Sequence, residues 1–494
     1  MTAPPKLYSD DHVEETTGAV LSKVDELVCD LLSKFSEEEK RTFLQIDRCG
    51  EWIRERGFKR VALQFPDAYL GLAPFLSAEI ERATTAKTFV LADTSYRSCC
   101  VDHIAAEHAN TDCLIHFGDA CLSDPSDKLP VLYIFGNLSV SNDSLRSSLL
   151  DQVKSCSDCR DLVVLVDTLF SDSTDQIVAE CRRSLPEHNV VACVVSRDAE
   201  FQKFGRSVPD VVRSSKEYIL FFVGLNESPL STLWLMTYPS CTGVVHFNPL
   251  LQKLETESSM VYSRHLRKRL LLTEKVRDAR TVALVIGTLG VKGHRESVDR
   301  MRALCKASQK QLYVISVGKL NVAKLANFAT DVDVFVLLSC PYGVMLNTAD
   351  YYRPIVCFFE AENALNPSKD WMCGSGWTPD FSDCLKDEIG ELGDDDADVS
   401  LVTGRIRTTH VVDDESSKDG SKQVAVYSAG DYFNERTWKG LDGSCDNGQS
   451  SLVLEEGRSG IAAEYQNEPG RFFPYKEFKL AANSSFVCIE TSNC

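Results

Sequence analysis

Three apolar runs of similar build open three successive parts of the chain, and they constrain its fold more than any other feature. They are Arg60–Asp67, Asp161–Thr168 and Arg280–Thr288, each with a charged residue, a nearly continuous apolar stretch and then Asp, Gly or Thr. Such runs are typical of strands buried on both faces, as in parallel sheets covered by helices. Further strand-like runs alternate with helical stretches after each opening. The pattern predicts an α/β protein of three similar domains in series, each a small parallel sheet flanked by helices.

The length of the chain, 494 residues, is too great for one ordinary hydrophobic core. We predict five segments: a helical extension over residues 1–50, α/β domains over 51–155, 156–270 and 271–375, and a C-terminal extension over 376–494. The composition changes after Trp377, and the acidic segment Asp383–Lys422 predicts exposed or disordered loops. A strand over 423–427 and a helix over 430–439 are expected beyond it, with the extension packing on the third domain.

The charge and the cysteine content exclude several classes of protein. A net charge of −19 argues against a chain that coats nucleic acid, because such proteins need a basic surface. No apolar run reaches 18 residues, so no membrane span is expected. The polar N-terminus has neither a secretory nor a transit pattern, so we expect a cytoplasmic, reducing location. There, the 19 cysteines do not form a disulfide framework; most are expected in the core and a few as metal ligands.

Cysteines far apart in the sequence follow three of the strand-like runs. These are Phe89–Ala92 before Cys99 and Cys100, Cys113–Phe117 before Cys121, and Val332–Leu338 before Cys340. Binding crevices form at the carboxyl ends of strands in an open parallel sheet. Three thiols delivered to three strand ends can therefore meet and hold a metal cluster, leaving a fourth iron without a protein ligand. Only one of the adjacent Cys99 and Cys100 is expected to point into such a site, and the residues leave open which one.

Other motifs are weaker. Cys156 and Cys159 form a CxxC pair, but no second CxxC or histidine pair accompanies it, so a zinc or redox role is not favoured. The segment Gly287–Gly293 could cradle an anion, but it lacks the spacing of known phosphate-binding loops, and a tight turn between strand and helix is favoured. Four further cysteines lie within apolar stretches and are expected in the core: Cys181, Cys193, Cys305 and Cys357.

Several segments closely resemble the diphthamide biosynthesis family of radical S-adenosylmethionine enzymes: residues 93–102, 105–108 and 116–123. Others favour the eukaryotic second-subunit members of that family: 287–290, 318–327, 334–341, 352–355, 436–441 and 457–462. The resemblance covers about residues 50–465. It implies three similar α/β domains arranged around a central iron–sulfur site, with an irregular C-terminal extension.

One segment departs from the catalytic members of the family. In those members each domain supplies one cluster cysteine, and the middle-domain cysteine follows a glycine. Here the corresponding stretch places Arg206 after Gly205, and a guanidinium cannot ligate iron. The resemblance therefore implies Cys99, Cys121 and Cys340 as the metal ligands, with Cys121 replacing the missing thiol and Cys100 in reserve. It implies no catalytic residue in this chain.

The family transfers a 3-amino-3-carboxypropyl group from S-adenosylmethionine to a histidine of elongation factor 2. The resemblance implies a non-catalytic subunit whose [4Fe–4S] cluster supports reduction of the catalytic cluster in a partner, the diphthamide biosynthesis protein 1 subunit, which binds S-adenosylmethionine. The implied further partners are elongation factor 2, as protein substrate, and a small iron-containing electron donor. Two alternatives remain: a chain that is itself catalytic, and a structural protein in which three thiolates and one further ligand hold zinc.

Overall fold

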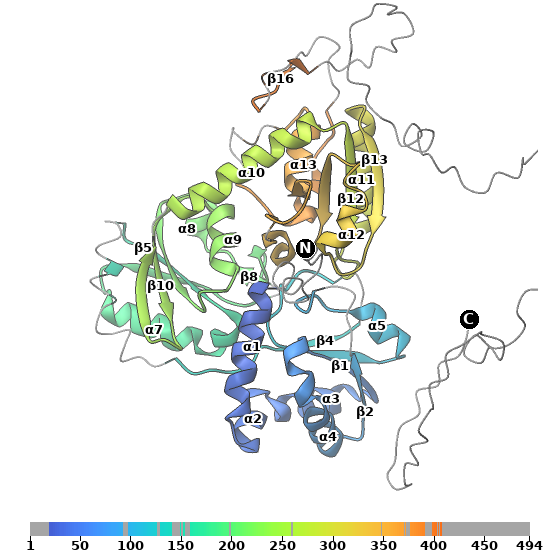
Figure 1. The fold of residues 1–494 in the computed structure, drawn as a ribbon. Coiled ribbons are helices and arrows are strands. Elements are labelled where there is room, and N and C mark those ends of the chain that lie inside the picture. Colours follow the sequence, from blue (N-terminus) through green and yellow to red (C-terminus); the bar gives the residue numbers. More distant parts are fainter. Residues whose placement is uncertain are drawn as a thin grey trace, which may run out of the picture. The chain divides into compact units, whose positions relative to one another are not determined.

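The computed structural model describes residues 19–91, 97–125, 129–140, 149, 152–153, 159–196, 199–257, 260–346, 348–369, 371, 376–390, 398–402, 404 and 406–407. The chain divides into two units, of which the second, Val424–Cys494, lies outside the described residues. The strand expected over 423–427 and the helix expected over 430–439 therefore lie outside them as well. The first unit contains three parallel or mainly parallel sheets and the helices around them (Figure 1).

All three sheets share one strand order. The first sheet has the order β2 (Lys87–Leu91), β1 (Arg60–Gln64), β3 (Cys113–Phe117) and β4 (Val131–Ile134). The second has the order β6 (Asn189–Cys193), β5 (Asp161–Val166), β9 (Tyr218–Val223), β10 (Cys241–Asn248) and β11 (Lys253–Glu257). The third has the order β13 (Gln311–Ser316), β12 (Thr281–Ile286), β14 (Val334–Leu338) and β15 (Ile355–Cys357). Within these sheets every pairing is parallel except that of β10 with β11. The strand that opens each part thus lies second in its sheet, and its successor forms the edge. The expectation of a mixed α/β protein with several small parallel sheets is confirmed.

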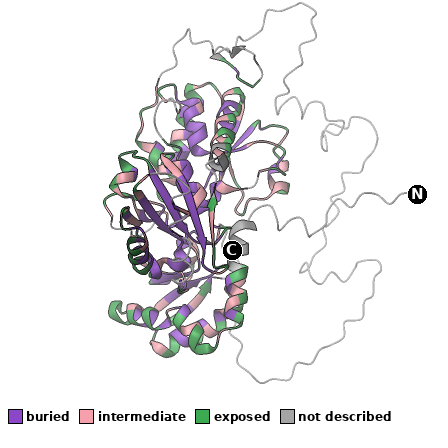
Figure 2. Cartoon of the chain, turned by 90° about the vertical axis from the view of Figure 1, so that its left-hand side faces the viewer, coloured by how far each residue is buried: buried purple, intermediate pink, exposed green. Residues whose placement is uncertain are grey.

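The central strands are buried along nearly their whole length, which explains their unbroken apolar sequences. Every residue of β3, β9 and β14 is buried, whereas the edge strand β13 is exposed or half-buried throughout. Figure 2 shows buried strands inside the protein and exposed residues concentrated on the helices. Short or partly polar strands such as β4, β10, β11 and β15 give no such run, and the sequence analysis did not identify them.

Helices surround these sheets and connect the strands. They are α1 (Ala19–Ser33), α2 (Glu37–Phe43), α3 (Ile46–Arg56), α4 (Ala73–Ala83), α5 (His103–His108), α7 (Thr174–Ser184), α8 (Asp210–Arg213), α9 (Leu230–Thr237), α10 (Met260–Asp278), α11 (His294–Ala307), α12 (Val322–Ala326) and α13 (Phe358–Leu365). Shorter 3-10 turns are η2 (Asp67–Leu72), η3 (Thr168–Ser173), η4 (Pro341–Met345) and η6 (Phe381–Lys386), and the two-residue strands are β7 (Gln202–Lys203), β8 (Arg206–Ser207), β16 (Asp398–Val399) and β17 (Ile406–Arg407). None of the helices described is both long enough and apolar enough to cross a membrane.

Apolar packing continues from one sheet to the next. One cluster of buried side chains joins helices α1–α3 to strands of the first and second sheets, and another joins the second and third sheets. Each predicted α/β domain contains one of the sheets, but the boundaries after residues 50 and 270 fall inside α3 and α10. The boundaries stay a prediction, since no break in the core marks them.

The start of the acidic C-terminal segment corrects the expectation of an exposed loop. Phe381 and Cys384 are buried although they lie in or next to this segment, and Trp377 just before it is fully buried. The Trp377 indole donates a hydrogen bond of 2.7 Å to Glu360 on α13. Scattered apolar residues anchor this stretch to the helices around the third sheet, and the acidic residues Asp383 and Asp387 between them pair with Lys203 and Lys369. Residues 391–397 and 408–422 lie outside the described part of the chain.

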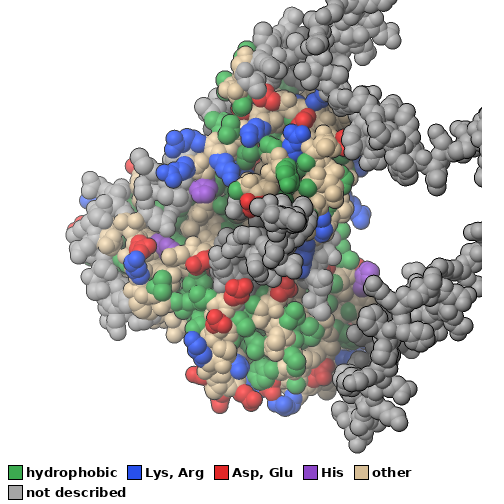
Figure 3. Space-filling model, in the orientation of Figure 1, with side chains coloured by type: hydrophobic (Ala, Val, Ile, Leu, Met, Phe, Trp, Pro, Cys, Tyr) green, Lys and Arg blue, Asp and Glu red, His purple; other side chains and the backbone are tan. Residues whose placement is uncertain are grey.

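Charge is distributed unevenly over the surface of this acidic protein. Figure 3 shows Lys and Arg side chains gathered over α10. Arg264, Arg267 and Lys268 are exposed on this helix. In this view of the described residues, the basic strip follows α10.

Candidate metal centre

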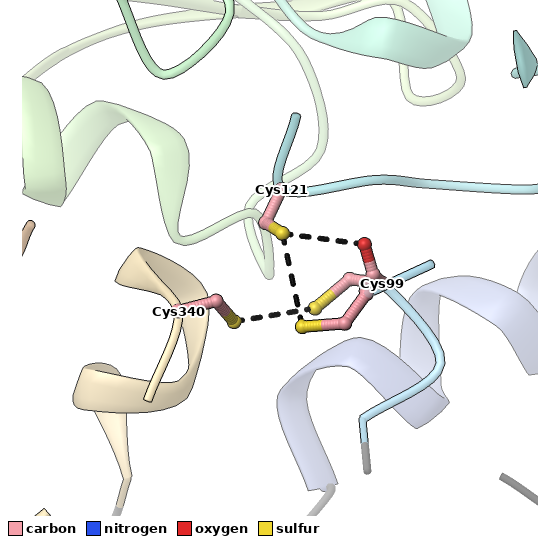
Figure 4. Close-up of side chains that lie close together, drawn as sticks. Cys99, Cys121 and Cys340 are labelled. Carbon is pink, nitrogen blue, oxygen red and sulfur yellow. Dashed lines mark hydrogen bonds between the residues drawn. The ribbon is translucent and has the colours of Figure 1, made fainter. Parts of the chain in front are cut away.

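Four cysteine thiols meet beyond the carboxyl ends of β2, β3 and β14. The Sγ atoms of Cys99, Cys100, Cys121 and Cys340 all lie within 4.8 Å of one another. Those of Cys99 and Cys340 are 3.7 Å apart, and those of Cys100 and Cys121 are 3.9 Å apart (Figure 4). All four residues are buried. The structure therefore brings together the three cysteines expected from the sequence, and it adds Cys100 as a fourth.

The presence of both Cys99 and Cys100 in the group corrects the expectation that only one of them faces the site. The chain turns at this point, with the Cys100 amide donating to the Arg97 carbonyl at 3.1 Å. Two polar side chains of the first sheet, Gln64 and His116, hold the turn through its backbone, and His116 Nε2 lies 2.9 Å from the Ser98 carbonyl oxygen. Gln64 on β1 donates to the Cys100 carbonyl at 2.7 Å and accepts from the Asp102 amide at 2.9 Å. This backbone geometry directs two successive thiols toward the same group of sulfurs.

The thiol of Cys121 is held directly against the first cysteine turn. Its amide donates to the Cys99 carbonyl at 3.1 Å, and its Sγ lies 3.3 Å from the same oxygen. The next residue, Leu122, has a φ of 53°, a conformation that few L-residues adopt. The chain therefore bends sharply immediately after the thiol.

The fourth thiol, Cys340, precedes η4 at the end of β14. The Gly343 amide donates to the Cys340 carbonyl at 2.9 Å and closes this turn. Arg269 on α10 donates to the Val344 carbonyl at 3.1 Å and lies over the Trp377 ring. The cysteine turn of the third sheet is thus anchored to α10 and to the C-terminal segment.

The thiols differ in acidity because they share hydrogen bonds in a buried place. Hydrogen bonds from Cys100, Cys121 and Cys99 hold the pKa of Cys340 well below its usual value, and the nearby positive charge of Arg97 acts in the same direction. Donation to the other thiols raises the pKa of Cys99 and Cys100. Since the thiolate is the metal-binding form, Cys340 is ready to ligate, whereas a metal must displace the protons of Cys99 and Cys100.

A set of four buried sulfurs fits zinc or an iron–sulfur cluster, because both are bound by thiolates. Bonds of about 2.3 Å around a tetrahedral zinc ion place the sulfurs about 3.8 Å apart. The spacings of 3.7 and 3.9 Å match a single ion closely. A four-iron cluster is larger and requires the loops to move apart. A small cavity lies beside the thiols, lined in part by Leu122, Ser123, Gly290 and Val291.

The glycine segment of the third sheet forms the tight turn that the sequence predicted. It links β12 to α11, and the Gly287 amide donates to the Leu338 carbonyl at 2.8 Å. A Cβ atom at Gly290 would lie 2.6 Å from the Val101 carbonyl oxygen. The turn therefore packs on the first sheet's cysteine loop.

Arg206, at the position where the resemblance placed a missing thiol, is completely buried. Its guanidinium donates to the carbonyl oxygens of Phe204 at 2.9 Å and Val166 at 3.3 Å. Two carboxyl groups, those of the half-buried Asp119 and the buried Asp167, share its surroundings. Burial and the neighbouring Asp167 raise the pKa of Asp119 to about 7, although Arg206 opposes this. Burial likewise raises the pKa of Asp167, again against the effect of Arg206.

The sequence analysis did not identify these carboxyl groups, although a signal was present. Asp167 directly follows the buried strand β5, and Asp119 comes two residues after the buried strand β3. Polar residues at the carboxyl ends of parallel strands commonly line a site.

The remaining cysteines of the described chain have structural surroundings. The four expected in the core, Cys181, Cys193, Cys305 and Cys357, are buried. Burial raises the pKa of each of their thiols, which disfavours the metal-binding form. Cys159 is half-buried, and its thiol donates to the Glu217 carbonyl at 3.1 Å. Its CxxC partner Cys156 lies outside the described residues.

Comparisons with known proteins agree on one family. The family model for diphthamide synthesis proteins matches residues 65–376. A Caenorhabditis elegans 2-(3-amino-3-carboxypropyl)histidine synthase subunit 2 is 43% identical over 475 residues, covering 93% of this chain and 97% of that protein. The proteins of the same name from Xenopus laevis and Schizosaccharomyces pombe are 36% and 32% identical, covering 87% and 86% of this chain and 93% and 90% of theirs. The crystal structure of Dph2 from Pyrococcus horikoshii with a 4Fe–4S cluster shares the fold, with a TM-score of 0.50, 17% identity, and coverage of 65% of this chain and 90% of that one.

Proposed function

Because the chain belongs to the diphthamide synthesis protein family, we propose that it is the iron–sulfur subunit of an enzyme that transfers a 3-amino-3-carboxypropyl group to a histidine of elongation factor 2. The observation that carries the proposal is the buried group of four thiols, Cys99, Cys100, Cys121 and Cys340. The names of its relatives and the cluster in the archaeal structure support the assignment.

The number of thiols favours a supporting role over a catalytic one. A [4Fe–4S] cluster supplies one-electron chemistry, and it also binds a substrate only where one iron lacks a protein ligand. Four thiolates can ligate all four irons. We therefore propose that S-adenosylmethionine binds to a partner subunit of the same family, and that this chain receives electrons from a small iron-containing protein for use in that partner.

The chain's own groups serve this role by holding the thiols and excluding water. Gln64 and His116 fix the cysteine turn of the first sheet through its backbone, and Arg269 fixes that of the third sheet. Cys340 gives up its proton first, since the neighbouring thiols hold its pKa well below the usual value. All four sulfurs are buried, which limits contact of a bound cluster with solvent and oxygen.

Zinc binding in a structural role is the second candidate. Two of the six spacings among the four sulfurs, 3.7 and 3.9 Å, favour it, because they are close to the spacing around one tetrahedral ion. Zinc gives no visible absorption and takes up no electron, so the two candidates are readily separated.

The test is anaerobic purification followed by analysis of iron, sulfide and zinc, with visible and electron paramagnetic resonance spectra. We expect about four irons and four sulfides per chain, as [4Fe–4S] stoichiometry requires. Changing Cys99, Cys121 or Cys340 to Ser should remove most of the iron, whereas the matched control Cys159→Ser should retain it. One tightly bound zinc per chain, with no spectrum of an iron–sulfur cluster, would establish the structural role instead.

Cys100→Ser separates the supporting role from a catalytic one. If Cys100 ligates the fourth iron, its replacement should leave a cluster that S-adenosylmethionine perturbs spectroscopically, while the unmodified cluster shows no response. A response of the unmodified chain, or efficient transfer by this chain alone with dithionite, would indicate catalysis here. With the partner present, Cys340→Ser should slow turnover more under a weak reductant than under dithionite, because a small strong reductant can bypass a relay.

A further inference from the structure

We infer that Arg206 is a positioning residue of the thiol site: it fixes the turn behind Cys121 and supplies a permanent positive charge that favours the reduced form of a bound cluster. The inference rests on the proposed iron–sulfur function. On reduction, one electron passes from an external reductant to the cluster, and Arg206 neither gains nor loses a proton, since a guanidinium stays charged at any usable pH.

The first support is the place of Arg206 in the repeated fold. In the first sheet, the loop after the edge strand β2 carries Cys99 and Cys100 and leads into α5. In the second sheet, the loop after the edge strand β6 carries Arg206 and leads into α8. In the second sheet, Arg206 therefore lies in the loop that corresponds to the loop carrying Cys99 and Cys100 in the first sheet.

The second support is contact with the Cys121 loop. Gly205 has a φ of 66°, and a Cβ atom there would overlap the side chain of Leu122. The backbone of this turn therefore lies directly against the residue that follows Cys121. Arg206 closes the turn through the Phe204 carbonyl and ties it to the end of β5 through the Val166 carbonyl. Loss of the guanidinium removes the hydrogen bonds that hold the turn in contact with the thiol loop.

The third support is the burial of the charge. Arg206 is 0% exposed, and a buried cation is tolerated only with hydrogen bonds and counter-charges. Asp119 and Asp167 supply the counter-charges, and Thr168 donates to Asp119 at 2.5 Å. Removing Arg206 makes this group more negative by one charge, which opposes the arrival of an electron nearby. In a poorly screened interior, that repulsion is larger than it would be in water.

The experiment compares Arg206→Gln and Arg206→Lys with the unmodified full-length chain after anaerobic reconstitution. The midpoint potential of the cluster is measured at pH 8.5 by dye-mediated titration, beside iron content and the thermal midpoint of the metal-free chain. We expect Arg206→Gln to lower the ratio of reduced to oxidised cluster about tenfold at a given potential, which is about 59 mV for one electron. Arg206→Lys retains the charge and should recover most of the ratio. Arg213→Gln, at a partly exposed arginine at the end of α8, is the matched control.

A second variant keeps the inference open to refutation if Arg206→Gln does not fold. Asp167→Asn removes one buried negative charge and should shift the ratio in the opposite direction, toward the reduced cluster. An unchanged midpoint potential in a folded, iron-loaded Arg206→Gln or Asp167→Asn protein overturns the inference. A midpoint potential that is as low in Arg206→Lys as in Arg206→Gln also overturns it. Failure of the unmodified chain to bind iron would instead overturn the proposed function.

Discussion

At the scale of single residues, the thiol site depends on polar side chains buried beneath it. Gln64 and His116 are both 0% exposed, and each bonds to the backbone of the cysteine turn. A buried polar group destabilises the fold unless it has a hydrogen-bond partner. His116 has one at Nε2, through the Ser98 carbonyl 2.9 Å away, and this requires that nitrogen to carry the proton. Burial lowers the pKa of His116 to about 4, so the ring is neutral at physiological pH.

His116 should make the metal-free protein less stable in acid. Its pKa is about 4 when folded and about 6.5 when unfolded, so between these values the unfolded chain binds a proton that the folded chain does not. This group's stabilising contribution is complete above pH 6.5 and is lost as the pH falls toward 4. From pH 7 to 4.5 the loss is about 2 kcal/mol in the free energy of unfolding.

Urea unfolding of the unmodified chain and of His116→Gln at these two pH values measures the effect. The variant should lose about 2 kcal/mol less than the unmodified chain over this interval. His108→Gln, at an exposed position on α5, is the control and should follow the unmodified chain. Parallel pH dependence of the unmodified and His116→Gln proteins would show that the ring does not stay neutral.

At the scale of elements, the site is made by turns that follow strands of different sheets and pack on one another. The turn between β12 and α11 lies against the first cysteine loop, where Gly290 faces the Val101 carbonyl. Val291 in the same turn forms an isolated bridge with Pro125. These contacts join the loops of the first and third sheets beside the thiols.

Gly290→Ala should weaken this junction. The added methyl group would lie 2.6 Å from a backbone oxygen, which cannot move without shifting the cysteine loop. Overpacking of this kind typically costs about 1–3 kcal/mol. We expect a lower thermal midpoint and reduced iron retention. Gly71→Ala is the matched control, because nothing lies within 4 Å of its added methyl group, and it should change neither quantity. Equal iron retention in both variants would show that the turn does not support the site.

At the scale of the whole molecule, the described part of the chain behaves as one packed body whose C-terminal segment reaches back to the site. Trp377 donates to Glu360, which lies 3.7 Å from Arg269, and Arg269 in turn donates to Val344 beside the Cys340 turn. A second buried pair, Arg300 with Glu362, holds α11 to α13 at 2.5 Å and also bonds the Asp387 carbonyl. The third sheet's thiol is therefore coupled to residues well beyond its own sheet.

Trp377→Ala should destabilise the protein and loosen the thiol site together. Truncating a fully buried tryptophan costs about 3–5 kcal/mol, and Glu360 loses a hydrogen-bond partner. We expect a lower thermal midpoint and lower iron content in the anaerobically purified chain. The contrasting variant deletes residues 393–397, whose acidic composition favours exposure, and it should retain both properties. Loss of iron on that deletion would show that the acidic segment packs against the core.

The sequence by itself determined the strands with unbroken apolar runs and most of the thiol site, because both leave local patterns. Unbroken apolar runs predicted β1, β5 and β12, and cysteines placed just after such runs predicted that one of Cys99 and Cys100 would meet Cys121 and Cys340. The tertiary structure alone decided what depends on contacts between distant segments. It turned Cys100 toward the other thiols, buried Trp377 under α10, and gave Arg206 its two carboxylate neighbours. The direction of a side chain in a turn, and the charges around a buried group, are set by residues far away in the sequence and leave no local pattern.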